Sequence, residues 1–231
     1  MKEGGESVNF ELIERVRMAI YDGFAVEAHA ASQEQIQVLV DTDEASVTRA
    51  IKQLAADHHL VADPAGHVVM AHPFSSMNLG FSVMGDKNLW WGGCAWDSFA
   101  IPHLVPNEPR VLVATTCPGC LTPLAWHVSR SRPPNGTEVA HFLVPMAACW
   151  DDVVHSCSNQ RLYCSEVCVE RWRVRMDQPK GYVMDLATLW ALASEWYTGR
   201  LDSPYVRRDP ELAKDYFRSV GLHGAFWGLD D

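Results

Sequence analysis

Apolar residues near the start of the chain recur at the three- and four-residue spacing of an amphipathic helix. Between Phe10 and about Tyr21 they fall at Phe10, Ile13, Val16, Ala19 and Ile20. A second helix is predicted after Ser32, because Ser32-Gln-Glu-Gln35 has the form of a capping box. A third is predicted from Glu44 to about Asp57, with an apolar face at Val47, Ala50, Ile51, Leu54 and Ala55.

Two short apolar segments after the third helix have the form of a β-hairpin. Leu60-Val61-Ala62 and His67–Met70 flank a turn at Pro64-Ala65-Gly66. Helix, helix, helix and hairpin is the element order of a winged helix-turn-helix. The pattern therefore predicts a winged-helix-like N-terminal domain over residues 1–72.

The third helix would be the recognition helix of such a domain, but its charge is unfavourable for DNA. It carries only two cations, Arg49 and Lys52, beside Glu44 and Asp57. A helix that reads DNA usually presents more positive charge. We therefore expect this domain to pack against the rest of the chain or to enclose a substrate.

From about Pro73 the pattern changes to short strand-like segments separated by Gly and Pro. Strands are predicted at Gly80–Met84, Asn88–Trp91, Arg110–Thr115, Leu124–Val128, Glu138–Leu143 and Gly181–Met184. Helices are predicted at Trp96–Ile101, ended by Pro102, at Ser165–Met176 and at Leu186–Thr198. The charged, aromatic tail after Leu201 should wrap the surface. The fold class is thus α+β, with a mixed or antiparallel sheet in a second domain over residues 73–231.

Charge and cysteine content narrow the range of functions. The 231 residues carry a net charge of −10, which opposes nucleic-acid binding because that affinity comes mainly from clustered Lys and Arg. No apolar run is long enough to span a membrane, and no signal peptide is visible, so we expect a cytoplasmic protein. In the reducing cytosol its seven cysteines should be thiols, which points to metal or thiolate chemistry.

One candidate site is the segment Gly92-Gly93-Cys94-Ala95-Trp96-Asp97. A cysteine at a helix start lies near unpaired backbone N–H groups, which stabilise a thiolate. Asp97, three residues later, would share its helix face, and neighbouring aromatic residues would raise the pKa of its carboxyl group. The alternative is a buried structural cysteine beside an Asp that only complements the helix dipole.

A second candidate site is formed by two cysteine pairs. Cys117-Pro-Gly-Cys120 is a tight turn, and Tyr163-Cys164-Ser-Glu-Val-Cys168 enters a predicted helix. Four thiolates supplied in this way suit a closed tetrahedral zinc site, and the form is similar to a treble-clef zinc knuckle. We therefore predict a structural Zn²⁺ bound by Cys117, Cys120, Cys164 and Cys168. Of the other cysteines, Cys149 has the surroundings of a core thiol, and Cys157 has no ligand role in this arrangement.

These segments resemble the alkylmercury (organomercurial) lyase family. The closest match is Cys94-Ala-Trp-Asp97 followed by an apolar helix and Pro102, preceded by Leu89-Trp90-Trp91. A later match is Ser156-Cys157 followed by Leu162-Tyr163-Cys164-Ser165 and Trp172. Cys117 occupies the position of a further family cysteine, and the family also has a winged-helix-like N-terminal domain. Familiar members lack cysteines at the positions of Cys120, Cys164 and Cys168, so this chain resembles a divergent branch.

The resemblance implies a mechanism and a set of roles. Cys94 and Cys157 would capture an organomercurial as a bis-thiolate, and Asp97 would protonate the carbon as a general acid. Trp90, Trp91, Trp96 and Phe99 would bind the hydrocarbon part of the substrate, although core packing explains them equally well. Catalysis would need no cofactor beyond an external thiol, and a mercuric reductase is the partner that would accept Hg(II).

Three alternatives remain open at this stage. The chain could be a relative of these lyases that acts on another organometal or on a carbon–heteroatom bond. It could be a non-catalytic, metal-sensing winged-helix regulator, a reading that the acidic recognition helix weakens. It could also be a zinc-binding interaction module without catalytic chemistry.

Overall fold

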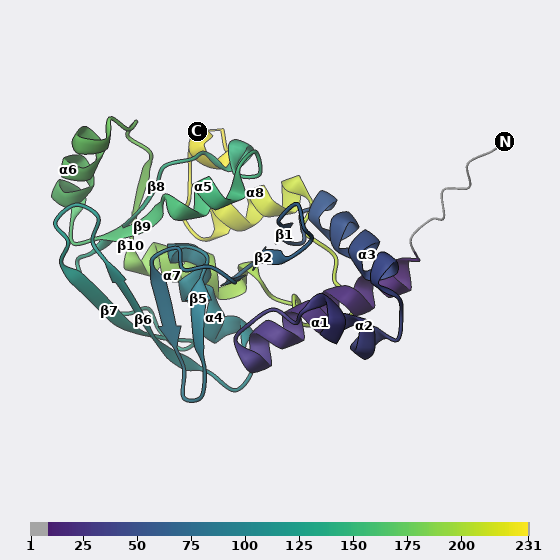
Figure 1. Ribbon diagram of the computed structural model, residues 1–231. Helices are drawn as coiled ribbons and strands as arrows, with labels where there is room; N and C mark the ends of the chain where they lie inside the picture. The colour runs from purple at the N-terminus through teal and green to yellow at the C-terminus, as the bar shows by residue number, and fades with distance from the viewer. Residues whose placement is uncertain (1–8, 231) are drawn as a thin grey trace.

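The N-terminal part of the chain is a bundle of three helices. The computed structural model describes residues 9–230, so residues 1–8 and 231 of the predicted domains lie outside the described part. The helices are α1 (Phe10–Glu27), α2 (Gln33–Val40) and α3 (Glu44–Ala56). The predicted capping box at Ser32 is present, and Asp43 caps α3 through Ser46 N. Figure 1 shows the three helices together at one end of the molecule.

A seven-stranded sheet runs from the end of this bundle into the rest of the chain. Its strands are β1 (Val61–Ala62), β2 (Val68–Ala71), β3 (Phe74–Ser75), β4 (Phe81–Met84), β5 (Leu89–Gly92), β6 (Arg110–Thr116) and β7 (Pro123–Ser129). The order is β1-β2-β3-β5-β4-β6-β7, and every neighbouring pair is antiparallel. The predicted boundary at 72/73 falls between the paired strands β2 and β3. The division into two domains and the winged-helix assignment stay predictions.

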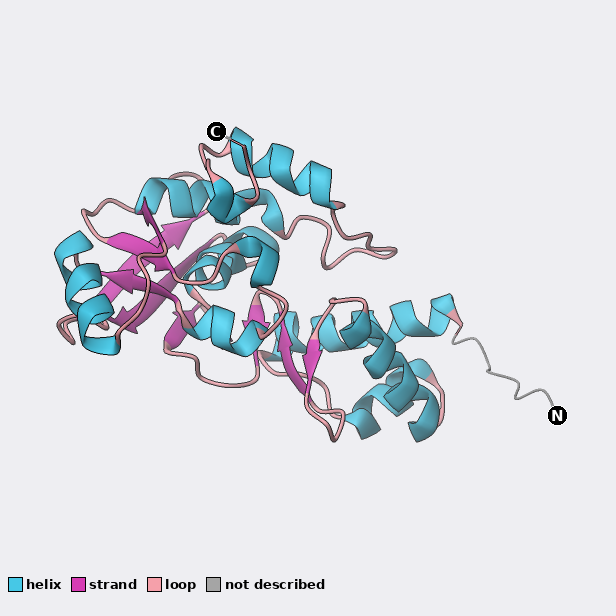
Figure 2. Ribbon diagram, turned by 90° about the horizontal axis from the view of Figure 1, so that it is seen from above, coloured by secondary structure: helices cyan, strands magenta, loops and turns pink. Residues whose placement is uncertain are grey.

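A second, three-stranded antiparallel sheet has the order β10-β8-β9. Its strands are β8 (Val139–Phe142), β9 (Gln160–Tyr163) and β10 (Tyr182–Asp185). The remaining helices are α4 (Ala95–Leu104), α5 (Val153–Ser158), α6 (Glu166–Met176), α7 (Leu186–Trp196) and α8 (Pro210–Ser219), with short 3₁₀ turns η1 (Met146–Ala148) and η2 (Ala225–Trp227). The predicted α+β class is confirmed, and Figure 2 shows most of the strands at the end of the molecule away from the N-terminal helices, with a few short strands beside those helices.

Helix α4 lies at the centre of the core and is longer than expected. Its first eight residues, Ala95–Pro102, are all buried, which fits a helix covered on every side. The sequence predicted an end at Pro102, but the helix continues to Leu104 with Pro102 inside it. Proline lacks only its own N–H as a donor. The N–H of Val105, three residues later, still donates to Ile101 O at 2.9 Å, so the last turn of the helix is formed.

The segment after Leu201 is not the surface wrap that the sequence suggested. It forms α8 and η2, and their aromatic residues Tyr216, Phe217 and Trp227 are buried. Phe217 and Trp227 pack against each other with ring centroids 4.9 Å apart. Burial of these large rings supplies the driving force that holds the segment to the core. No helix within residues 9–230 is long and apolar enough to cross a membrane.

Candidate active site

Cys94 stands at the junction of strand β5 and helix α4. It is the N-cap residue of α4, and its Sγ accepts a hydrogen bond from Asp97 N at 3.3 Å. The two glycines before it are required by close packing. A Cβ on Gly92 would meet Ser98 Oγ at 2.1 Å, and one on Gly93 would meet Asp97 Oδ2 at 2.3 Å. The Gly-Gly pair therefore lets the chain turn directly beneath the cysteine and the carboxylate.

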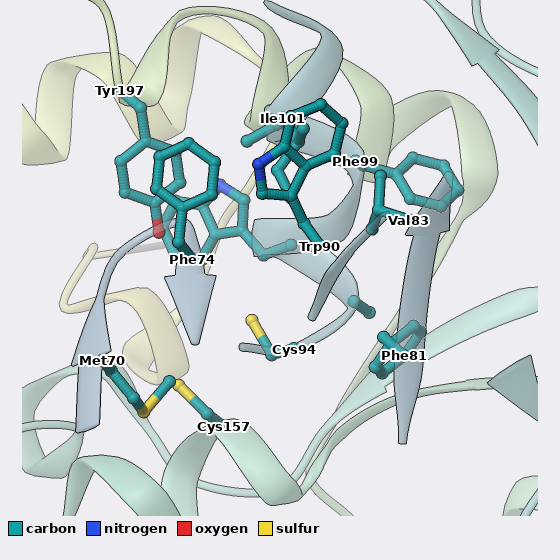
Figure 3. Close-up of a cluster of buried hydrophobic side chains, with 14 of the residues drawn as sticks. Met70, Phe74, Phe81, Val83, Trp90, Cys94, Phe99, Ile101, Cys157 and Tyr197 are labelled. Carbon is teal, nitrogen blue, oxygen red and sulfur yellow. The ribbon is translucent and has the colours of Figure 1, made fainter. Parts of the chain in front are cut away.

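Cys157 reaches the same place from helix α5, more than sixty residues later in the chain. Its thiol neighbours that of Cys94, and both residues are almost fully buried. Figure 3 shows the two cysteines in one cluster with Met70, Phe74 and Tyr197. The structure therefore brings together two of the three residues for which the family resemblance implies a catalytic role.

Asp97, the third of these residues, is 1% exposed and is held by two side chains. His72 Nδ1 lies 3.0 Å from Asp97 Oδ2, and the Tyr197 hydroxyl donates a short hydrogen bond to Oδ1. The ligand atoms of His72, Asp97 and Cys157 all lie within 4.8 Å of one another. A carboxyl group, an imidazole and a thiol thus share one small buried space.

Burial determines the protonation of the groups around Asp97. It raises the pKa of Cys94 well above the usual thiol value, although Asp97 N–H donates to that sulfur. For Cys157 the contact with Cys94 lowers the pKa, but burial and the nearby Asp97 outweigh it and the net shift is upward. Burial also raises the pKa of Tyr197, so its phenol keeps the proton that it donates. The position of Cys94 at a helix start favours a thiolate, and burial opposes that effect.

A cavity of about 410 Å³ opens onto these residues. Its lining contains His72, Cys94, Asp97, Cys157 and Tyr197, together with aromatic rings from Trp96, Trp150, Trp196, Phe217 and Trp227. This volume is that of a small-molecule site, with a mostly apolar lining and a few convergent polar groups. The chain therefore has room for a small apolar ligand beside the two thiols.

Of the four aromatic residues predicted to bind substrate, Trp96 alone lines the cavity. Trp90 is buried elsewhere, and its indole N–H donates to Phe24 O at 2.7 Å. Trp91 follows it on the opposite face of β5, and Phe99 packs on Trp126 with centroids 6.3 Å apart. Successive residues of a strand face opposite sides, so Trp90 and Trp91 could not both reach one pocket. The rings that line the cavity come mainly from the later part of the chain.

The apolar neighbours of Cys149 in sequence predicted a core position. The residue instead lies in the cavity wall. It ends the short η1 turn and is half-buried. Burial raises the pKa of Cys149 to about 11, so this thiol is also protonated at neutral pH. The cavity thus contains three cysteines.

Positive charge gathers around this cavity in a chain that is acidic as a whole. Arg200, Arg207, Arg208 and Lys214 line it, and Asp97 is the one carboxylate among its lining residues. Arg207 lies over the Trp150 ring at 5.3 Å, and Arg208 lies over Tyr216 at 4.8 Å. Lys214 pairs with Glu211 at 2.9 Å, which leaves Arg200, Arg207 and Arg208 as the cations of this lining that favour an anionic ligand.

The two predicted zinc-binding pairs also meet. The sulfur atoms of Cys117, Cys120, Cys164 and Cys168 lie within 4.8 Å of one another, in a cluster separate from the cavity lining. All seven cysteines, each within the described residues, are free of disulfide bonds.

The family assignment rests on sequence comparison. The sequence model described as alkylmercury lyase matches residues 74–198, which is more than half of the chain. The chain belongs to the alkylmercury lyase family. The matched region contains Cys94, Asp97 and Cys157, and it also includes both halves of the four-cysteine cluster.

A solved structure supports the fold of this lyase. It is titled "Crystal structure of the mercury-bound form of MerB2" and is 15% identical in sequence, with a TM-score of 0.62. The alignment covers 84% of this chain and 93% of that one. No curated protein matches in sequence.

Three residues of the cavity lining had no signal in the sequence. His72 lies just before the family match, and Tyr197 and Arg200 lie near or beyond its end. Arg200 links them to α1, because its Nη1 donates to Tyr21 Oη at 3.0 Å and to His72 O at 3.2 Å. A lone His, Tyr or Arg in an apolar context is common, so spacing along the chain could not have identified these contacts.

Proposed function

We propose that this lyase breaks the carbon–mercury bond of a small organomercurial by protonation, with Cys94, Cys157 and Asp97 as the reacting groups. The observation that carries the proposal is the convergence of two buried thiols and one buried carboxyl group in the lining of a single cavity. Hg(II) is a soft cation that prefers thiolates, and two thiols side by side suit its linear coordination. The mercury-bound relative of the same fold supports this choice of metal.

The first step is thiol exchange at mercury. The substrate arrives as R–Hg–SR′, carried by an external thiol. Cys94 Sγ bonds to mercury, the Hg–SR′ bond breaks, and the proton of Cys94 leaves with the carrier as R′SH. Because Cys94 is protonated in the empty site, this proton transfer is part of the step.

The second step moves the proton of Cys157 to carbon through Asp97. Cys157 bonds to mercury and gives its proton to the Asp97 carboxylate, whose oxygen lies within 4.8 Å of that sulfur. Asp97 then protonates the carbon as the C–Hg bond breaks, and R–H leaves. The sum is R–Hg–SR′ plus two cysteine thiols giving R–H, R′SH and mercury held by two sulfurs. Mercury remains Hg(II) throughout.

His72 and Tyr197 serve this transfer by fixing the carboxyl group. Each contacts a different oxygen of Asp97, so the group cannot rotate away from the thiols. Holding reacting groups in position is a large part of enzymatic rate enhancement. The aromatic walls formed by Trp96, Trp150 and Trp196 surround the hydrocarbon part of the substrate and exclude water from the bond that breaks.

Two external thiols would then exchange Hg(II) off the enzyme, and a mercuric reductase in the cytoplasm is the partner that would take it up. The N-terminal helices serve to enclose the site. Tyr21 of α1 bonds to the Arg200 side chain, and Arg200 in turn bonds to the backbone carbonyl of His72. This role accounts for a winged-helix-like unit that carries little positive charge.

The test measures by gas chromatography the benzene that is released from phenylmercury in the presence of excess thiol. Wild-type protein should release one benzene for each phenylmercury consumed, over many turnovers. Asp97→Asn should bind phenylmercury but release benzene about 10²- to 10⁴-fold more slowly, and Cys157→Ser should be as impaired. Asp177→Asn, at an exposed Asp that ends α6, is the matched control and should turn over normally. Absence of hydrocarbon release by wild-type protein would sink the proposal.

A further inference from the structure

The four-cysteine cluster joins the two sheets of the molecule. Cys117 and Cys120 lie in the tight connection between β6 and β7 of the seven-stranded sheet. Cys164 directly follows β9 of the three-stranded sheet, and Cys168 lies in the first turn of α6. The two pairs are more than forty residues apart in sequence, so their meeting depends on the tertiary fold.

The spacing of the sulfur atoms fits a bound metal. Four thiolates around a zinc ion at about 2.3 Å stand about 3.8 Å from one another at the corners of a tetrahedron. Cys120 Sγ and Cys164 Sγ are 3.5 Å apart, and all four sulfurs lie within 4.8 Å. Cys164 N also points at Cys117 Sγ, at 3.5 Å. Backbone N–H groups aimed at the sulfurs are a regular feature of thiolate metal sites, because they offset the negative charge.

The backbone around the cluster is shaped for close approach. A Cβ on Gly119 would lie 2.2 Å from Cys168 O, so only glycine lets the turn pack against the first turn of α6. Leu121 N donates to Cys117 O at 2.8 Å, and Cys117 N donates to Thr122 O at 2.9 Å, which closes the turn around its sulfurs. Arg175 of α6 donates to Pro118 O from the other side.

We propose that Cys117, Cys120, Cys164 and Cys168 bind one structural zinc ion, which fixes the position of Cys157 relative to Cys94. Cys94 follows β5 of the seven-stranded sheet, and Cys157 lies on α5, directly before β9 of the three-stranded sheet. The metal thus cross-links the two parts of the fold that each supply one mercury-binding thiol. The positioning role rests on the proposed function, whereas the metal site itself does not.

Zinc suits this cluster better than catalytic use of its thiols. Cys117 and Cys168 are buried, and the cavity lining contains none of the four residues. A site closed by four protein ligands leaves no open position for a substrate, which is the usual form of a structural zinc site. Because such a metal binds the folded chain only, its binding free energy adds to stability.

Metal analysis tests the site directly. Full-length protein purified under reducing conditions should contain one zinc per chain, and exchange with Co(II) should give the thiolate charge-transfer and tetrahedral ligand-field bands of a four-sulfur site. Cys120→Ser should lower bound zinc at least tenfold, whereas Cys149→Ser, at a cysteine outside the cluster, should keep it. Wild-type protein that neither contains nor takes up zinc, or that holds a Cys120–Cys164 disulfide after reduction, would overturn the assignment.

Hydrogen exchange tests the positioning role without mercury. In Cys120→Ser the amides of α5 and β9 should exchange at least tenfold faster than in wild type, while those of α1–α3 stay unchanged. Cys120→His, which restores a zinc ligand, should recover both the zinc and the slow exchange. Benzene release should fall in Cys120→Ser and recover in Cys120→His, in parallel with the exchange rates.

If Cys120→Ser loses zinc but keeps wild-type exchange in α5 and β9 and wild-type turnover, the positioning role is wrong. If zinc and exchange behave as expected but wild-type protein releases no benzene, the failure lies in the proposed function. If Cys120→Ser unfolds throughout, zinc and cobalt binding by wild-type protein still decide the site.

Discussion

His72 Nδ1 lies 3.0 Å from Asp97 Oδ2, and both side chains are buried and line the cavity. The contact joins the connection between β2 and β3 to the first turn of α4. Because Tyr197 contacts the other oxygen of the same carboxyl group, Asp97 is oriented by two segments outside its own helix. Orientation of the carboxyl group is therefore a property of the whole fold.

Replacing His72 by alanine should slow turnover without weakening mercury binding. A hydrogen bond to a charged group contributes about 2 kcal/mol, so kcat should fall about thirtyfold. KM should change little, because the two cysteines proposed to bind mercury remain. Steady-state benzene release gives both constants.

His72→Gln is the matched variant, because its amide N–H can still donate to Asp97. It should recover most of the lost kcat. Equal loss in His72→Ala and His72→Gln would show that hydrogen bonding to the carboxyl group is not what His72 supplies.

Alkylation of Cys94 should respond to pH as expected for a thiol whose pKa is raised by burial. The thiolate is the reactive form, so its rate of modification should keep rising roughly tenfold per pH unit above about pH 8.5, where the rate for a free cysteine levels off. The rate of modification is measured at each pH by brief treatment with a small methylating reagent. Quantitative mass spectrometry of the Cys94 peptide then gives the methylated fraction. A cysteine peptide in the same tube is the control, and a plateau shared by both would contradict the raised pKa.

The cations of the cavity should favour substrates carried by anionic thiols. Phenylmercury bound to a thiol with two carboxylates should show a kcat/KM about tenfold higher than with a neutral thiol, and added salt should erase the difference. Arg207→Gln should reduce the preference. Arg218→Gln, at an exposed residue paired with Asp215 on the outer face of α8, should preserve it. If the preference for the anionic thiol does not change with added salt, the cations of the cavity are not its cause.

Arg17 is a buried cation whose loss should destabilise the fold. It forms two hydrogen bonds of 2.7 Å with Glu14 and donates to Arg200 O and Asp202 O. Arg17→Met leaves these acceptors without their partner, so the free energy of unfolding should fall by about 3 kcal/mol. Urea denaturation measures the change.

Arg173→Met is the control for Arg17→Met. Arg173 also forms two hydrogen bonds with a Glu three residues away, but that pair lies on the surface, where water screens it. Its removal should change stability far less. Comparable losses in the two variants would show that burial is not the cause.

Much of the fold follows from local sequence signals. The three N-terminal helices, the capping box at Ser32 and eight of the strands were predictable because apolar period and capping residues act over a few residues. Helix α5 and strand β9 were not predicted, because each is short and their stability comes from packing and pairing with β8.

The site was predictable only in part, for the same reason. Cys94 and Asp97 share one helical turn, so their proximity follows from spacing. His72 and Tyr197 reach Asp97 from 25 residues before it and 100 residues after it, and no local pattern records such contacts. The aromatic residues nearest Cys94 in sequence were the natural choice for a substrate pocket, yet alternation along β5 and burial against α1 place Trp90 elsewhere.

Residues 205–228 supply a large part of the cavity wall, through Phe217 and Trp227 in particular. The enclosure of the two thiols therefore depends on a segment that lies far from both of them in sequence. Proteolytic removal of residues 205–228 would take away this part of the wall and leave Cys94 and Cys157 open to solvent and to any soft metal ion.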